Sequence, residues 1–134
     1  MAKTFKLRIL TMDKIVYDGE AIKLLTKAKN GDIEFLVNCA PCIASLVPCI
    51  TTIVNEKEEK LNYFTSNGIV NVKENKITIC CDSSESKNDI DVERAEKSKE
   101  RAERRLEKRD QYDVERAKLS LLRANLRIKL HDMK

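Results

Sequence analysis

The chain has no Trp, a single His, three Gly and two Pro in 134 residues, and aromatic side chains make up only 4% of it. With so few aromatics it lacks the stacking platforms that single-stranded nucleic-acid binders use. His131 belongs to no His-Glu-x-x-His motif, and the chain contains neither a Gly-rich phosphate loop nor a Ser in a nucleophile context. These absences predict that the chain is not an enzyme.

Long apolar runs are also missing. No stretch approaches the roughly 20 apolar residues of a membrane-spanning helix. The first ten residues alternate apolar and basic side chains, unlike a signal peptide, so we expect a cytosolic protein. Five Cys is an odd number in a chain without an export signal, which favours reduced thiols over a disulfide framework.

The amino-acid composition of the chain changes at about Asn88. All Gly, Pro and Cys residues precede this position, among short β-branched runs, whereas residues 88–134 have no Gly or Pro and a dense alternation of charge. The change predicts an α+β chain, with a strand-rich domain over residues 1–84 and a helical domain over residues 88–134.

The first domain shows the two-residue period of strands. Phe5, Leu7 and Ile9 alternate with Lys6 and Arg8. Further strands are expected over residues 22–26, 33–37, 50–54, 61–65, 69–72 and 77–81. Turn signals lie between them at Asp18-Gly19, Asn30-Gly31, residues 55–60, Asn67-Gly68 and the two-residue hairpin Glu74-Asn75. Short strands at this spacing predict an antiparallel β-sandwich.

The second domain has two helical segments. Residues 82–89 are expected to form a linker, and Asp91 is the expected N-cap of a first helix. Ala95, Ala102 and Leu106 share one face of that helix, which is a thin stripe weighted toward alanine. Residues 109–112 lack apolar periodicity. Asp113 can then cap a second helix with a wider stripe, formed by Val114, Ala117, Leu121, Ala124 and Ile128 and broadened by Leu119, Leu122, Leu126 and Leu130.

These two helices predict an antiparallel hairpin of low stability. Helices gain most of their stability from packing, and the first helix offers mainly alanine to its partner. The second helix has more leucine than the first can cover. We therefore expect another surface, either the sandwich or a different protein, to cover the remainder.

Several segments carry a family resemblance. The joint between the domains reads Ile90-Asp91-Val92-Glu93-Arg94-Ala95. It is preceded, in order, by Val16-Tyr17-Asp18-Gly19, Lys29-Asn30-Gly31-Asp32, Asn38-Cys39-Ala40-Pro41 and Ser66-Asn67-Gly68-Ile69-Val70-Asn71-Val72. In this order and spacing, over essentially its whole length, the chain resembles the epsilon subunit of the bacterial F-type (rotary) ATP synthase.

The resemblance implies a non-catalytic subunit of the central stalk, or rotor. The sandwich would grip the gamma stalk and touch the ring of c subunits, and so help to couple ion translocation to ATP synthesis. The hairpin would unfold, extend into the alpha/beta catalytic hexamer and restrain ATP hydrolysis. The resemblance also implies a peripheral location at the cytoplasmic face of the bacterial membrane, through the complex alone.

In several members of that family the folded hairpin binds ATP. The matching positions here are Glu85, Ile90, Asp91, Arg94, Ala95, Arg101, Arg123 and Arg127. Arginine forms forked bonds with phosphate oxygens, and Arg123 and Arg127, four residues apart, share one helical face. The resemblance thus implies ATP as a regulatory ligand and no required cofactor. The alternative is that these arginines are solvated or contact acidic segments of the catalytic subunits.

The resemblance also implies a rotor contact near Asp32 and Cys39. This part departs from the family pattern, which usually has a second Gly where Glu34 stands and a His where Cys39 stands. Asn67 and Cys49 likewise occupy positions where Gly is common. We expect these changes to affect the surface that faces the rotor and to leave the fold intact.

Two rival interpretations concern metals and nucleic acids. Cys39-Ala40-Pro41-Cys42 has the spacing of redox and zinc sites, and Cys80 with Cys81 could complete a set of four thiolates. However, the first pair does not open a helix, and alternation along a strand sends Cys80 and Cys81 to opposite faces. We therefore expect buried or loop thiols and no bound metal.

The other rival is a basic helical hairpin, a nucleic-acid or chaperone-like module with no link to ATP synthase. Residues 89–134 carry 14 basic and 11 acidic side chains, a slight excess. In the first helix Glu93, Glu96, Glu100, Glu103 and Glu107 interleave with Lys97, Arg101, Arg104 and Arg105. This interleaving predicts no basic face and no nucleic-acid partner.

Overall fold

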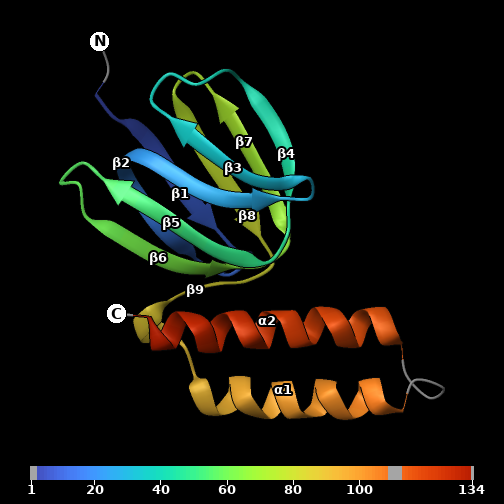
Figure 1. Ribbon diagram of the computed structural model, residues 1–134. Coiled ribbons are helices and arrows are strands. Elements are labelled where there is room, and N and C mark those ends of the chain that lie inside the picture. The colour runs from blue at the N-terminus through green and yellow to red at the C-terminus, as the bar shows by residue number, and fades with distance from the viewer. Residues whose placement is uncertain (1–2, 109–112, 134) are drawn as a thin grey trace. The chain divides into compact units, whose positions relative to one another are not determined.

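The computed structural model of the chain describes residues 3–108 and 113–133. It divides into two compact units, residues 1–86 and residues 87–134 (Figure 1). The first unit consists of strands and the second of two helices, so the predicted fold class, a sandwich followed by a helical hairpin, is confirmed.

The strands of the first unit are short, with one exception. Their bounds are β1 Phe5–Leu10, β2 Ile15–Ala28, β3 Gly31–Leu36, β4 Cys42–Leu46, β5 Cys49–Asn55, β6 Lys60–Thr65, β7 Gly68–Lys73, β8 Lys76–Cys81 and β9 Ser84–Ser86. In the second unit a 3-10 turn at Lys87–Asp89 precedes α1 (Val92–Glu107) and α2 (Val114–Asp132).

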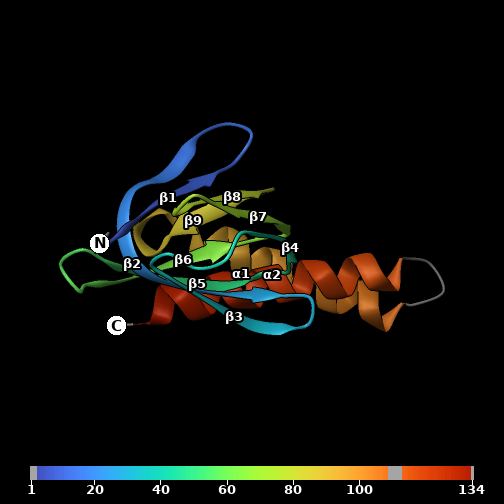
Figure 2. The same ribbon diagram turned by 90° about the horizontal axis from the view of Figure 1, so that it is seen from above.

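The long strand β2 belongs to both layers of the sandwich. Its first half pairs antiparallel with β1, and its second half pairs antiparallel with β3 and β5. The hydrogen-bonded order is β1-β8-β7-β4-β2-β5-β6-β9. Figure 2 shows β2 curving from the layer of β1 to that of β3. All pairs are antiparallel except β1 and β8, which are parallel, with Leu7 opposite Ile77.

The core lies between the layers and follows the predicted alternation. Phe5, Leu7 and Ile9 are buried, while Lys6 and Arg8 on the same strand are exposed. The largest fully buried side chains on the other strands are Leu24, Ile53, Phe64, Val70, Val72, Ile77 and Ile79. Burial of this kind stabilises a sandwich by about 1.5–3 kcal/mol for each large aliphatic or aromatic side chain.

Three threonine hydroxyls also enter the interior, where they contact one another. Thr51 Oγ1 lies 2.9 Å from Thr26 Oγ1 and 2.7 Å from Thr65 Oγ1, and all three side chains are buried. The Cys49 thiol lies beside them, 3.3 Å from Thr26 Oγ1. Because hydroxyls both donate and accept, this chain of contacts removes the cost of burying unpaired polar groups. Cys49 thus fits the interior where the related family commonly has Gly.

The structure corrects two expectations about the strands. Asp18 and Gly19 do not form a turn; they lie inside β2, opposite Arg8 and Leu7 of β1. The turn is earlier, where Thr11 N–H donates to the Lys14 carbonyl at 3.0 Å. Strand β4 was not predicted, because its sequence is short and includes Ala and Ser, which have low strand propensity.

Part of the expected linker over residues 82–89 has regular secondary structure instead. It contains β9, which pairs with β6, and the 3-10 turn that follows. Ser84 and Ser86, which favour a linker in the sequence, are tolerated in this short edge strand because only three residues pair.

Both helices begin where the sequence predicts. Asp91 Oδ1 accepts the backbone N–H of Arg94 at 3.1 Å, and Asp113 Oδ1 accepts that of Arg116 at 3.2 Å. Each carboxylate therefore satisfies a free N–H of the first helical turn. The connection at residues 109–112 lies outside the described residues. Within the described part, neither helix is long and apolar enough to cross a membrane.

Gly68 provides a test of the fold. A Cβ at this position would press on the Cys80 carbonyl and lie 2.8 Å from Cys81 Cα, so backbone would have to move. We predict that Gly68→Ala lowers the free energy of unfolding of the sandwich by about 1–3 kcal/mol, the usual cost of overpacking. Urea unfolding, followed by NMR signals of the strands, measures this cost.

Gly19→Ala is the matched control. There the new Cβ would lie 3.3 Å from the hydroxyl at the end of the Tyr17 side chain, which can move aside. This variant should change the free energy of unfolding by less than about 0.5 kcal/mol. Equal effects of the two substitutions would contradict the close approach of β7 to β8.

Candidate functional site

Alanine dominates the contact between the two helices. The buried side chains of α1 are Ala95 and Ala102, 3% and 2% exposed, and α2 buries Ala117, Ala124 and Leu130. The thin stripe predicted for the first helix is therefore confirmed. A buried methyl group contributes about 0.8 kcal/mol, much less than a leucine side chain. Four of the five fully buried side chains of the two helices are thus alanines, most leucines of α2 are only partly buried, and Leu122 is 42% exposed.

Three of the proposed nucleotide-binding residues have a structural role in the hairpin. Ile90 is 9% exposed and Ala95 is buried, so both side chains contribute to packing. Asp91 is the N-cap of α1 and binds the Arg94 backbone N–H. The motif Ile-Asp-x-x-Arg-Ala thus sets the start of α1 through its Asp and packs the helix through its Ile and Ala.

The four arginines supply the charge that a phosphate ligand would need. Arg94 and Arg101 are exposed on α1, seven residues apart and hence on one face, and Arg101 Nη2 donates to Ser98 Oγ at 3.3 Å. Arg123 and Arg127 are half-buried on α2. The remaining proposed residue, Glu85, lies in β9 of the first unit, opposite Phe64.

The charges of α1 are separated on its surface, although they alternate in the sequence. Glu93, Glu96, Glu100, Glu103 and Glu107 are spaced by three or four residues and form one acidic row. Arg94, Lys97, Arg101, Arg104 and Lys108 have the same spacing and form a basic row beside it. The expectation that the first helix has no basic face was wrong, because the helical period of 3.6 residues sorts the interleaved charges into rows.

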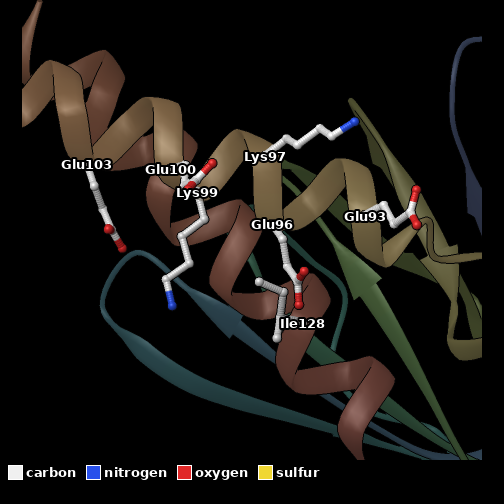
Figure 3. Close-up of a pocket in the computed structure, with 7 residues that line it drawn as sticks. All are labelled: Glu93, Glu96, Lys97, Lys99, Glu100, Glu103 and Ile128. Atoms are coloured by element: carbon white, nitrogen blue, oxygen red, sulfur yellow. The ribbon is translucent and has the colours of Figure 1, made fainter.

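A groove follows the acidic row. Its lining consists of side chains of α1 and one residue of α2: Glu93, Glu96, Lys97, Lys99, Glu100, Glu103 and Ile128. Figure 3 shows Glu96, Lys99 and Glu103 extending from α1 on the side of Ile128, and Lys97 extending the opposite way. The Glu100–Arg104 ion pair, at 3.5 Å, is largely exposed and contributes little. Like charges three or four residues apart weaken a helix by about 0.2–0.5 kcal/mol per pair, which adds to the low stability of the hairpin.

The two residues nominated for the rotor contact lie at opposite ends of β3. Asp32 is exposed near its start and pairs with Lys27 of β2. Cys39 is half-buried in the loop over residues 37–41 that follows the strand, and it packs against the core. The structure therefore places them at the two opposite ends of this strand.

The thiols differ in environment. Cys80 is exposed and Cys81 is buried, as the alternation along a strand predicts. Burial raises the pKa of the Cys81 thiol to about 11, so this thiol is protonated at neutral pH. Among the described residues, no three Cys, His, Asp or Glu side chains are arranged to hold a metal ion.

Comparison with known families decides the assignment. The family described as "ATP synthase, Delta/Epsilon chain, beta-sandwich domain" matches residues 4–87, and the one described as "ATP synthase, Delta/Epsilon chain, long alpha-helix domain" matches residues 88–131. The chain belongs to the delta/epsilon chain family of ATP synthase. It is an accessory subunit of the ATP synthase, not a catalytic one.

Relatives support this membership along the whole chain. An ATP synthase epsilon chain of Clostridium novyi is 44% identical over 110 residues, which are 82% of this chain and 84% of that one. An ATP synthase epsilon chain of Clostridium botulinum (strain Langeland) is 41% identical over 133 residues, 99% of this chain and 100% of that one. Both the sandwich and the hairpin are therefore shared with epsilon chains.

Solved structures share the fold at lower identity. A chain in the Euglena gracilis mitochondrial ATP synthase superposes with a TM-score of 0.81 at 17% identity and covers 93% of this chain and 79% of that one. A chain in the central stalk and c-ring structure of Tetrahymena thermophila ATP synthase has a TM-score of 0.53 at 16% identity and covers 65% of this chain and 68% of that one. At such identity these likenesses concern the fold alone.

The alanine contact of this epsilon-family hairpin can be tested directly. Ala102 is 2% exposed, so a leucine there has no room and should force α1 and α2 apart. We predict that Ala102→Leu lowers the stability of the hairpin by about 1–3 kcal/mol. Thermal melting of the helical circular dichroism signal measures this change.

Glu103→Leu places the same side chain on the neighbouring, exposed position. It should alter the stability of the hairpin by no more than about 0.5 kcal/mol. If Ala102→Leu melted at the temperature of the unmodified chain, the hairpin would not depend on close packing of small residues.

Proposed function

We propose that the chain is the rotor-attached regulatory subunit of its ATP synthase, in which the sandwich binds the central stalk and the hairpin controls ATP hydrolysis. The observation that carries this proposal is the contrast between its two units. The sandwich has a continuous core of large apolar side chains, whereas the hairpin is held mainly by alanines. An attachment requires a rigid surface, and a switch requires two states that differ by only a few kcal/mol.

The attachment is supported by an apolar outer face on β4, β7 and β8. Ile43 is 74% exposed and Ile69 is 52% exposed, and the pairing of the strands places both on the face that bears the exposed Cys80. Clusters of exposed apolar side chains on a rigid sheet commonly mark protein interfaces. We assign this face to the gamma stalk, and the edges near Asp32 and Cys39 to the ring of c subunits.

The hairpin acts on the alpha/beta catalytic hexamer. Opening of the hairpin exposes its alanine and leucine side chains beside the basic row of α1, which is already exposed in the folded hairpin. This combination fits a surface that has both apolar and acidic residues. In the same proposal the chain associates with the cytoplasmic face of the bacterial membrane only through the complex.

ATP is proposed as a regulatory ligand of the folded hairpin. Arg94 and Arg101 of α1 and Arg123 and Arg127 of α2 are the residues that would bind its phosphates, because guanidinium groups form paired, charge-assisted bonds to phosphate oxygens. ATP bound to the folded hairpin alone would stabilise that state and oppose its opening. No cofactor is required.

Removal of the hairpin tests the control of hydrolysis. We predict that ATP synthase assembled with a chain lacking residues 88–134 hydrolyses ATP faster by a factor of about five or more, which corresponds to a typical coupling free energy. Steady-state hydrolysis by the purified complex is the measurement. Unchanged hydrolysis in a fully assembled complex would remove the inhibitory role.

ATP binding is tested on the isolated full chain. Arg127→Ala should weaken ATP binding by about tenfold or more in a calorimetric titration, because one charge-assisted hydrogen bond to phosphate is lost. Arg116→Ala removes the same charge from an exposed position of α2 that the proposal does not use. Equal affinities of the two variants would refute this assignment of the phosphate-binding residues.

A further inference from the structure

Asn75 joins three segments that are far apart in the sequence. Its side-chain Oδ1 accepts the backbone N–H of Asn38 at 2.8 Å, and its Nδ2 donates to the Thr4 carbonyl at 2.8 Å. Its own backbone carbonyl accepts the N–H of Lys6 at 3.3 Å. One residue thus connects the start of β1, the turn between β7 and β8, and the loop between β3 and β4.

The loop over residues 37–41 needs such a connection. Asn38 has φ of 58°, in the left-handed region that residues with a Cβ rarely adopt. Within the loop, Cys39 N–H donates to the Leu36 carbonyl at 3.3 Å, and the Asn38 N–H is bound by Asn75. The amide of Asn75 therefore holds the backbone at the residue where the chain reverses before Cys39.

Asn75 is itself held in place by the sheet. It is the second residue of the two-residue turn between β7 and β8, where Glu74 and Asn75 have φ of 49° and 59°. The pairing of Lys73 with Lys76 closes this turn. Left-handed angles at both positions are those of the turn that fits the twist of a hairpin. The side chain thus projects from a rigid base.

We propose that Asn75 is the positioning residue of the loop over residues 37–41, and that it fixes the surface which this loop, with Cys39, presents to the rotor. The loop is then part of a rigid contact surface and does not adapt to its partner. This inference rests on the proposed function for the identity of the partner, but the hydrogen bond from Asn38 to Asn75 can be tested without it.

The first experiment measures hydrogen exchange of the Asn38 amide by NMR in the full chain. Asn75→Gly keeps the left-handed backbone of the turn and removes both side-chain bonds, so exchange at Asn38 should accelerate by about tenfold or more. Asn75→Asp retains an oxygen that accepts this N–H but replaces the donor to the Thr4 carbonyl by a second acceptor, so exchange at Asn38 should accelerate less than in Asn75→Gly. Glu74→Gly, at the adjacent left-handed position, is the control for the turn and should have no effect on Asn38.

The second experiment compares the same variants for incorporation into ATP synthase, in competition with the unmodified chain. Asn75→Gly should incorporate least well, Asn75→Asp should be intermediate, and Glu74→Gly should incorporate normally. Equal incorporation of Asn75→Gly, or equal loss by all three variants, would overturn the positioning role. Failure of the unmodified chain to incorporate would instead contradict the proposed function, and acceleration at Asn38 would still show that Asn75 holds the loop.

Discussion

Close packing of small side chains between α1 and α2 is the interaction on which the behaviour of the hairpin depends. Ala95 and Ala102 of one helix, and Ala117 and Ala124 of the other, are buried and let the helices approach each other. Each contributes little free energy, and the row of like charges on α1 opposes the helix further. This balance supports the proposal that a partner opens the hairpin by supplying only a few kcal/mol.

The sandwich differs from the hairpin in that its two layers are joined by a shared strand. Strand β2 passes from one layer to the other and pairs with β1, β3 and β5, so neither layer can separate without breaking its hydrogen bonds. The interior is filled by large apolar side chains, and the buried hydroxyls of Thr26, Thr51 and Thr65 bind one another. A surface fixed in this way is suited to attachment, and the exposed Ile43 and Ile69 lie on it.

Local signals in the sequence predicted the parts of the fold that local chemistry determines. These include the caps Asp91 and Asp113, the alternation of β1 and the hairpin at Glu74-Asn75. The turn expected at Asp18-Gly19 failed because pairing with β1 continues through it, and the basic face of α1 was missed because helical geometry sorts charges that alternate in the sequence. For the candidate site, family resemblance supplied the arginines, but the packing of Ile90 and the bond between Asn75 and Asn38, 37 residues apart, required the fold.

The most direct test of this account is hydrogen exchange across the whole chain, resolved residue by residue under native conditions. Amides of residues 92–107 and 114–132 should exchange through a local opening with a lower free energy than those of β1, β5 and β8, because the hairpin and the sandwich are separate compact units and most fully buried side chains of the two helices are alanines. The same free energy of opening for helices and strands would mean that the chain unfolds as one unit. That result would contradict a hairpin that opens while the sandwich stays attached.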